Sequence, residues 1–374
     1  MTSIVDSTSR VQAPPFGRFF LPGPTEVRHD VLYAMTQQMI GHRGKAIEDL
    51  MARVAPKLQA VFRTARPVYT SSSSATGLME AGVRNAVRER VLCCINGSFS
   101  ERFHKAAVNS GIPADKLEVP YGQYHSPELL ADALKGGKYD VVTVVHSETS
   151  TGVLNPIEEL AKVAHAAGDV VLVVDTVSSM AAARIESDTW ELDYVLTGSQ
   201  KALAMPPGLA FCSANERVLA RAKESKRRGL YFDLLEFDQY YRKNQSPNTP
   251  AVSLLYALDV QIDHIVSEGL DARWARHTAM AERTWGWVGE MQAKGVDTRL
   301  YAPEGYRSPS VTCITAPPGT TGSQLVSAMK AKGFTIASGY GQLKDAMVRV
   351  GHMGDHTMDE LETLLDTLGA VMTA

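Results

Sequence analysis

The sequence has 374 residues, of which 44% are hydrophobic and 21% charged, and its formal net charge is -3 at pH 7. This near-neutral, slightly acidic balance gives no electrostatic reason to expect nucleic acid or an anionic membrane surface as a partner. No apolar run approaches the roughly 20 residues that a membrane-spanning helix needs, and no secretory signal is visible, so we expect a cytoplasmic protein without a membrane partner.

The cysteines and histidines give no sign of a metal site. The four cysteines are Cys93, Cys94, Cys212 and Cys313; two are adjacent and none forms a CxxC pair. The ten histidines include no HExxH pair. We therefore expect no bound metal and no disulfide framework, and this cysteine usage is typical of a reducing compartment.

The first 20 residues are polar and contain prolines, which predicts an N-terminal arm. From there, short apolar runs alternate with helical patterns. The runs occupy residues 66–73, 90–98, 139–148, 169–179, 192–201 and 207–214, and the helical patterns occupy 75–87, 100–111 and 155–168. Continuous Val- and Leu-rich runs between helices are typical of a mainly parallel sheet that is covered on both faces.

The pattern of predicted helices and strands changes near residue 255. Two long helical patterns (253–269 and 271–295) precede a short strand (308–317), a helix (321–333) and a final helix. We therefore predict an α/β protein with an arm at 1–20, a large domain at 21–255 and a smaller α+β domain at 256–374.

Polar residues end several of the predicted strands, and ligands bind at such strand ends in open α/β sheets. Asp175 follows the run "VVLVV", and Lys201 lies at the end of the next run, among uncharged neighbours. An acid and an amine delivered by neighbouring strands suit pyridoxal phosphate, whose aldehyde reacts with lysine and whose ring nitrogen pairs with an acid. The alternative is that Asp175 caps a helix and Lys201 lies at a rim.

The stretch "SSSSATG" (71–77) stands between a strand and a helix. Small and hydroxyl residues there allow an anion to reach a helix N-terminus. The stretch is neither a Walker loop nor GxGxxG, so nucleotide-binding interpretations lose their main support. A serine-rich N-cap turn without a ligand remains the alternative. Phe99, after "INGS", is placed to stack on a planar cofactor or simply to pack.

Several motifs together resemble one family. They are "LPGPTEV" (21–27), "HSETSTGVLNP" (146–156), "VVDTVSS" (173–179), "GSQKALAMPPG" (198–208) and "VRVGHMG" (348–354). In this order they resemble class V aminotransferases of fold type I, in particular the alanine–glyoxylate and serine–pyruvate group. The resemblance covers the chain from about residue 18 to its end. It implies a large domain with a mainly parallel sheet, a smaller C-terminal domain and pyridoxal 5'-phosphate as cofactor.

The resemblance also implies roles for individual residues. Lys201 would be the lysine that forms the Schiff base, and Asp175 would pair with the pyridine nitrogen. Val177 would pack beneath the ring, Thr149 would bond its phenolic oxygen, and Phe99 would take the stacking position, where relatives often have Trp or Tyr.

The remaining implied contacts are with the phosphate and the substrate. The residues at the phosphate would be Ser74, Ala75, Thr76 and Gln200. Arg349 would grip the substrate carboxylate, a role that suits a planar guanidinium because it binds a carboxylate with two hydrogen bonds. Gly23 would line the substrate pocket.

Relatives form homodimers with shared active sites, and a segment of one subunit reaches the other's phosphate. Here the matching segment is 244–258, but Gln245 and Asn248 stand where those relatives have Tyr and Thr, with Thr249 one position along. We expect Asn248 or Thr249 to make the contact, and Gln245 stays open. His42 and Arg43 either lie at the pocket edge or cap the next helix.

The expected activity is transfer of an amino group from alanine or serine to glyoxylate or pyruvate by a ping-pong mechanism. The alternatives are a 2-aminoethylphosphonate–pyruvate transaminase and a non-catalytic binding protein that retains the fold. A cysteine desulfurase would need a cysteine in the loop before Arg349, and residues 337–347 contain none.

Overall fold

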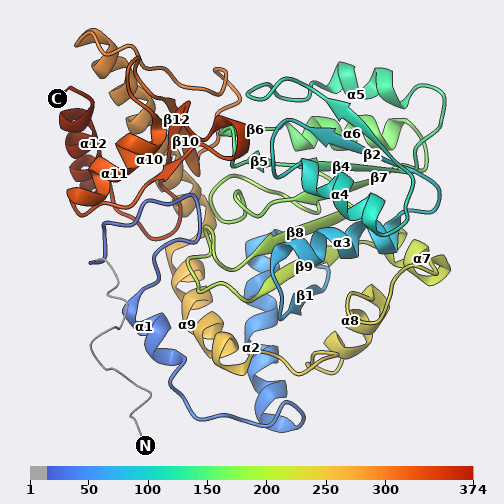
Figure 1. Ribbon diagram of the computed structural model, residues 1–374. Coiled ribbons are helices and arrows are strands. Elements are labelled where there is room, and N and C mark those ends of the chain that lie inside the picture. The colour runs from blue at the N-terminus through green and yellow to red at the C-terminus, as the bar shows by residue number, and fades with distance from the viewer. Residues whose placement is uncertain (1–14, 374) are drawn as a thin grey trace, which may run out of the picture.

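The structure, a computed structural model that describes residues 15–373, is built around a seven-stranded sheet (Figure 1). The strands are β1 (Val68–Ser71), β2 (Val91–Ile95), β3 (Ala114–Glu118), β4 (Val141–Val145), β7 (Val171–Asp175), β8 (Tyr194–Gly198) and β9 (Ala210–Ala214). They lie in the order β1-β9-β8-β7-β4-β2-β3. The neighbours from β8 to β3 pair in parallel, and β9 pairs antiparallel with β8 and β1. The mainly parallel sheet is therefore confirmed.

Helices bury both faces of this sheet. One face is covered by α2 (Lys45–Phe62), α5 (Pro127–Leu134), α6 (Ile157–Ala166) and α9 (Val252–Glu268). The other is covered by α3 (Ala75–Ala86), α4 (Glu101–Asn109), α7 (Glu216–Glu224) and α8 (Leu234–Tyr241). In β7, Leu172 and Val174 join the first core while Val171 and Val173 join the second. Apolar residues at every position, rather than at alternate ones, follow from this double burial.

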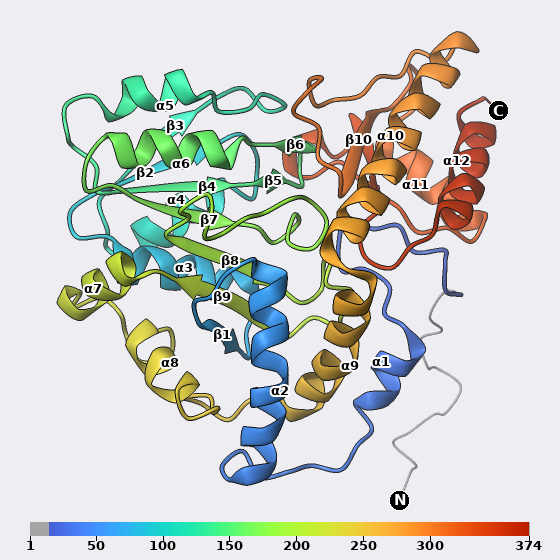
Figure 2. The same ribbon diagram turned by 180° about the vertical axis from the view of Figure 1, so that it is seen from behind.

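A separate, smaller core lies around a three-stranded sheet of β10 (Val311–Thr315), β12 (Met347–Gly351) and β11 (Ala337–Ser338). It is covered by α10 (Leu270–Ala293), α11 (Gly322–Ala331) and α12 (Met358–Met372), as Figure 2 shows from behind. Capping boxes start α11 and α12. Phe20, within the predicted arm, is fully buried in this core. Residues 1–14 of that arm lie outside the described residues.

Three shorter elements complete the chain: α1 (His29–Ala34), a two-stranded ribbon of β5 (Ser147–Glu148) and β6 (Val153–Leu154), and the 3-10 helix η1 (Gly341–Leu343). The division near residue 255 stays a prediction. Helix α9 contains that position without a break and packs on the core of the large sheet, and α10 then packs in the smaller core.

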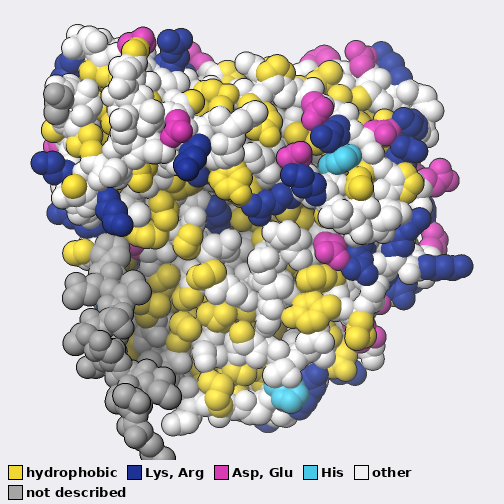
Figure 3. All heavy atoms as spheres, viewed as in Figure 1, with side chains coloured by type: hydrophobic (Ala, Val, Ile, Leu, Met, Phe, Trp, Pro, Cys, Tyr) yellow, Lys and Arg dark blue, Asp and Glu magenta, His cyan; other side chains and the backbone are white. Residues whose placement is uncertain are grey.

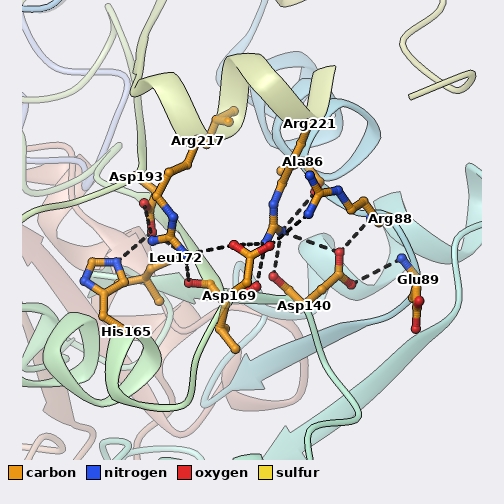
Figure 4. A network of polar contacts seen from close by, with 12 residues as sticks. Ala86, Arg88, Glu89, Asp140, His165, Asp169, Leu172, Asp193, Arg217 and Arg221 are labelled. Carbon is orange, nitrogen blue, oxygen red and sulfur yellow. Dashed lines mark hydrogen bonds and ion pairs between the residues drawn. The ribbon is translucent and has the colours of Figure 1, made fainter. Parts of the chain in front are cut away.

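Buried charges hold the amino ends of the parallel strands (Figure 4). The Arg221 guanidinium, on α7, donates to the Asp140 carbonyl at 2.7 Å and pairs with the Asp169 carboxylate at 2.9 Å. The buried carboxylate of Asp193 accepts from the backbone of β7 at 2.8 Å and from Arg217 at 3.1 Å. Because these residues precede β4, β7 and β8, the network stabilises one edge of the sheet and leaves the opposite edge for a site.

Two absences concern the described part of the chain. Between residues 15 and 373, no helix is long and apolar enough to cross a bilayer. Within the same range, no group of three or more His, Cys, Asp or Glu side chains could hold a metal ion.

Candidate active site

A cavity of about 260 Å³ lies at the carboxyl ends of β7 and β8. Its walls are formed by Gly23, Pro24, Ser74, Ala75, Thr76, Met79, Phe99, Arg102, Val145, Ser147, Thr149, Asp175, Val177, Ser178, Gln200 and Lys201. The structure thus brings together every site residue predicted from the sequence except Arg349, Asn248 and Thr249.

Two neighbouring parallel strands deliver the acid and the amine. Asp175 is the last residue of β7, and Lys201 follows soon after β8 ends at Gly198. Asp175 is buried, and its Oδ1 accepts a hydrogen bond from the Val177 N–H at 2.7 Å. Burial raises the pKa of Asp175 to about 7, against the opposing effects of that N–H and of the Lys201 ammonium. A buried acid of this kind gains stability when it faces a cation.

The Lys201 side chain crosses a tight space beside the N-terminal segment. It is 8% exposed, and its Nζ donates a hydrogen bond to the Pro22 carbonyl. Burial, reinforced by the nearby Arg349, lowers the pKa of Lys201 to about 7. A Cβ on Gly23 would lie 2.3 Å from Lys201 Cδ, and Gly23 has φ +95°, so only glycine fits there. Because its pKa is about 7, the Lys201 amine is partly neutral near pH 7, as a nucleophile or base requires.

The start of α3 forms another wall of the cavity. Ser74 is the N-cap residue, but its side chain makes no capping hydrogen bond. The first turn of the helix, which begins at Ala75 and Thr76, contains no acidic side chain. Free N–H groups and the positive end of the helix dipole make this wall suitable for an anion. Gln200 lines the same cavity.

Glu148, which sequence reasoning missed, fastens two of the loops around the cavity. It is fully buried, and its carboxylate accepts hydrogen bonds from the backbone N–H of Phe99 (3.3 Å), Ser100 (2.8 Å) and Ser150 (3.1 Å). A Cβ on Gly97 would lie 2.4 Å from Glu148 Cδ, which explains the glycine in "INGS". The carboxylate therefore holds the backbone of the loop that carries Phe99.

Comparison with known proteins agrees with this geometry. The family described as "Aminotransferase class-V" matches residues 96–364. The chain belongs to the class-V aminotransferase family. An uncharacterized aminotransferase of Methanocaldococcus jannaschii is 37% identical over 342 residues, which are 89% of this chain and 87% of that protein. A serine–glyoxylate aminotransferase of Methylorubrum extorquens is 31% identical over 373 residues, which are 96% of this chain and 91% of that protein.

A solved structure extends the likeness to the whole fold. The alanine–glyoxylate aminotransferase from Nostoc sp. superposes with a TM-score of 0.89 at 27% identity, covering 98% of this chain and 99% of that one. Since the class-V family depends on pyridoxal phosphate, the chain is a pyridoxal-phosphate-dependent aminotransferase of fold type I. The predicted family, fold, enzyme class and cofactor are all confirmed.

Arg349 of the aminotransferase lies on β12, in the smaller sheet, and contacts the wall residue Thr149 without itself lining the cavity. It is 7% exposed, and it donates to the Thr149 carbonyl at 3.2 Å and to the Ser338 carbonyl at 2.9 Å. Within residues 15–373 it forms no ion pair with a carboxylate. Burial lowers its pKa. The guanidinium is thus held in place with no protein anion against it.

Other predicted residues of the aminotransferase lie away from this cavity. Asn248 and Thr249 are outside its walls, and Gln245 donates to a carboxylate of α2 at 2.8 Å. Their contact with a second subunit therefore stays a prediction. His42 and Arg43 are exposed, and the Arg43 guanidinium lies 5.2 Å from the centre of a tyrosine ring in α8. Neither residue lines the cavity.

Arg102 and Tyr340 are further residues that sequence reasoning missed. The Arg102 guanidinium lies 4.7 Å from the centre of the Phe99 ring and donates to the Tyr340 hydroxyl at 3.2 Å. The spacing offered one signal, because residues three apart meet on a helical turn and Arg102 follows Phe99 by three. Tyr340 is brought in from the smaller sheet, so no local pattern could indicate it.

Proposed function

We propose that this aminotransferase moves an amino group from a small amino acid, alanine or serine, to a small 2-oxo acid, glyoxylate or pyruvate, by a ping-pong mechanism. The observation that carries the proposal is one cavity into which Lys201 and Asp175 both project with pKa values near 7. Enzymes tune acids and bases toward the working pH in this way. Relatives named for serine–glyoxylate and alanine–glyoxylate transfer support the choice of substrates.

The residues of the cavity fit pyridoxal phosphate by their chemistry. The phosphate would lie at the start of α3, on Ser74, Ala75, Thr76 and Gln200. The ring would lie between Lys201 and Asp175, with Phe99 and Val177 against it and Thr149 at its phenolic oxygen. The N-terminus of α3 has no capping side chain, and Asp175 is a buried acid. A phosphate at the helix N-terminus and a protonated ring nitrogen beside Asp175 would stabilise both.

Bound pyridoxal phosphate supplies an aldehyde that condenses with amines and a ring that withdraws electrons from the substrate's Cα. Lys201, whose Nζ is neutral in part at pH 7, would hold the cofactor through its aldehyde. It would act as base and then acid for the proton that leaves the substrate's Cα and is delivered to the cofactor's aldehyde carbon. Asp175 would hold a proton on the ring nitrogen, because a buried carboxylate is stabilised by a cation that faces it.

Arg349 would bind the carboxylate of the substrate. Its backbone contacts fix the plane of the guanidinium, so that the substrate carboxylate is held with two parallel hydrogen bonds. Gly23 leaves room where any side chain would strike Lys201. Together, Arg349 and the open space at Gly23 would hold the substrate's Cα within reach of the Lys201 amine. Proton transfer requires such positioning.

We further propose that two copies of the chain form a dimer with shared active sites, in which Asn248 or Thr249 reaches the partner's phosphate. Hydrophobic side chains gather on the lower half of the face in Figure 3. Large apolar side chains that remain exposed in the single chain include Leu32, Tyr33, Met39, Leu230 and Tyr231. Exposed apolar surface of this kind is typical of protein interfaces. The four cysteines are free thiols, which supports a cytoplasmic location.

Half-reactions test the substrates directly. The purified holoenzyme is mixed with one amino acid at a time, and the visible absorbance of its cofactor is followed. We expect alanine or serine to bleach it and glyoxylate or pyruvate to restore it. Aspartate and 2-aminoethylphosphonate serve as competing donors. If neither alanine nor serine bleaches the cofactor while either competitor does, the proposed substrates are wrong.

A further inference from the structure

We propose that Arg102 is a further cofactor-binding residue, whose guanidinium supplies the positive charge for the phosphate of pyridoxal phosphate. This inference rests on the cofactor placement proposed above. It assigns a function to a cavity residue that none of the motifs of the sequence contains.

The first support is the charge of the cavity. A phosphate monoester carries roughly 1.5 to 2 negative charges near pH 7. The groups expected around it, Ser74, Ala75, Thr76 and Gln200, are neutral, and the end of α3 contributes only about half a positive charge. Among the described residues that line the cavity, the only cations are Lys201 and Arg102. Because Lys201 is committed to the aldehyde, Arg102 is the cation that remains.

The second support is the position of the guanidinium. Arg102 Nη1 lies 3.5 Å from the hydroxyl of Thr76, in the first turn of α3. It therefore stands beside the wall that is built for an anion. Its electrostatic effect reaches the reacting groups as well, since it contributes to lowering the pKa of both Asp175 and Lys201.

The third support is that no protein anion neutralises this guanidinium. Throughout residues 15–373, Arg102 has no ion pair with a carboxylate; its partners are the Thr76 hydroxyl, the Tyr340 hydroxyl and the face of the Phe99 ring. Lys105, one turn along α4, pairs with Glu101 at 3.0 Å instead. Arg102 is therefore oriented by neutral groups and keeps its charge for a ligand.

Tyr340 extends this arrangement to the smaller sheet. The centre of the Tyr340 ring lies 5.1 Å from that of the Phe99 ring, and the Arg349 guanidinium lies 5.6 Å from the centre of the Tyr340 ring. Arg102 and Arg349, the cations assigned to the phosphate and to the substrate carboxylate, thus meet on opposite parts of one tyrosine. Tyr340 therefore links the two residues assigned to the anion sites.

The test compares two forms of vitamin B6 that differ only in the phosphate. Dissociation constants of pyridoxal phosphate and of unphosphorylated pyridoxal are measured by absorbance titration of the cofactor-free protein. For Arg102→Gln we expect affinity for pyridoxal phosphate to fall about tenfold, the typical size of one charge-assisted hydrogen bond, and affinity for pyridoxal to change less than about twofold. Lys105→Gln, on the same helix, is the matched control and should change neither.

For Arg102→Gln, two results would overturn the inference: an equal loss for both ligands, or no loss for pyridoxal phosphate. Arg102→Lys keeps the charge and guards against a folding defect of the glutamine variant. Its loss should be smaller, and a loss equal to that of Arg102→Gln would also contradict the role assigned to the charge. Failure of the wild-type protein to bind pyridoxal phosphate would instead refute the proposed function itself.

Discussion

Replacing Lys201 by methionine should stabilise the cofactor-free protein. Burial lowers the pKa of this lysine from its ordinary 10.5 to about 7. Each pKa unit corresponds to about 1.4 kcal/mol, so holding the ammonium in the folded protein costs about 4 kcal/mol at pH 7. Methionine has a similar length and no charge, but it forfeits the hydrogen bond to Pro22 and the attraction to Asp175. We therefore expect a net gain of about 2–4 kcal/mol in the free energy of unfolding.

The pH dependence gives the sign of this effect. Between pH 7 and 10.5 the folded wild-type protein binds fewer protons at Lys201 than the unfolded chain does, so its stability rises with pH. The methionine variant lacks this term, which falls by about 3.5 kcal/mol between pH 7 and pH 10, so its advantage should disappear by pH 10. Urea unfolding of both proteins at pH 7 and pH 10 measures it, with Lys105→Met as an exposed control. A variant that is no more stable than wild type at pH 7, or an advantage that does not change with pH, would refute the reasoning.

Three further predictions concern other parts of the molecule. Arg349→Lys should raise the KM for the amino donor by about 10- to 100-fold with a smaller change in kcat, because an ammonium cannot form two parallel hydrogen bonds; an unchanged KM in steady-state assays would contradict its role. Glu148→Gln should lower the free energy of unfolding by about 2 kcal/mol, because an amide turns one N–H donor toward backbone donors; wild-type stability in urea would contradict this. Arg221→Met should lower the free energy of unfolding by about 3 kcal/mol, because it leaves the carbonyls that precede β4 and β7 without their hydrogen-bond donor. An unchanged thermal midpoint would contradict a stabilising role for the network in Figure 4.

The part of the site at the strand ends could be predicted because its geometry is local. Parallel strands finish at one edge of the sheet, so the residues after each run, Asp175 and Lys201 among them, must meet there. An anion site at Ser74 could be predicted because a helix starts there directly after a strand. These inferences need only the order of the elements along the chain.

The rest of the site depends on contacts between distant segments. Arg349 was indicated only by the resemblance to a family, because its position on β12 says nothing by itself about the large sheet. Tyr340 reaches Phe99 across the two cores, and Arg221 meets the starts of two strands through its long side chain. Glu148 was hidden beside Thr149 in one motif. Three of its partners are backbone N–H groups, which leave no mark in the side-chain sequence, and the fourth is the Ser150 hydroxyl.

The central claim is that Lys201 is the lysine to which the cofactor is joined. Borohydride reduction of the holoenzyme makes that bond permanent, and peptide mass spectrometry then locates it. We expect the added pyridoxyl mass on Lys201 and on no other lysine, and we expect it to vanish in Lys201→Ala. Modification of a different lysine, or an unmodified Lys201 in a protein that still carries out transamination, would contradict the account.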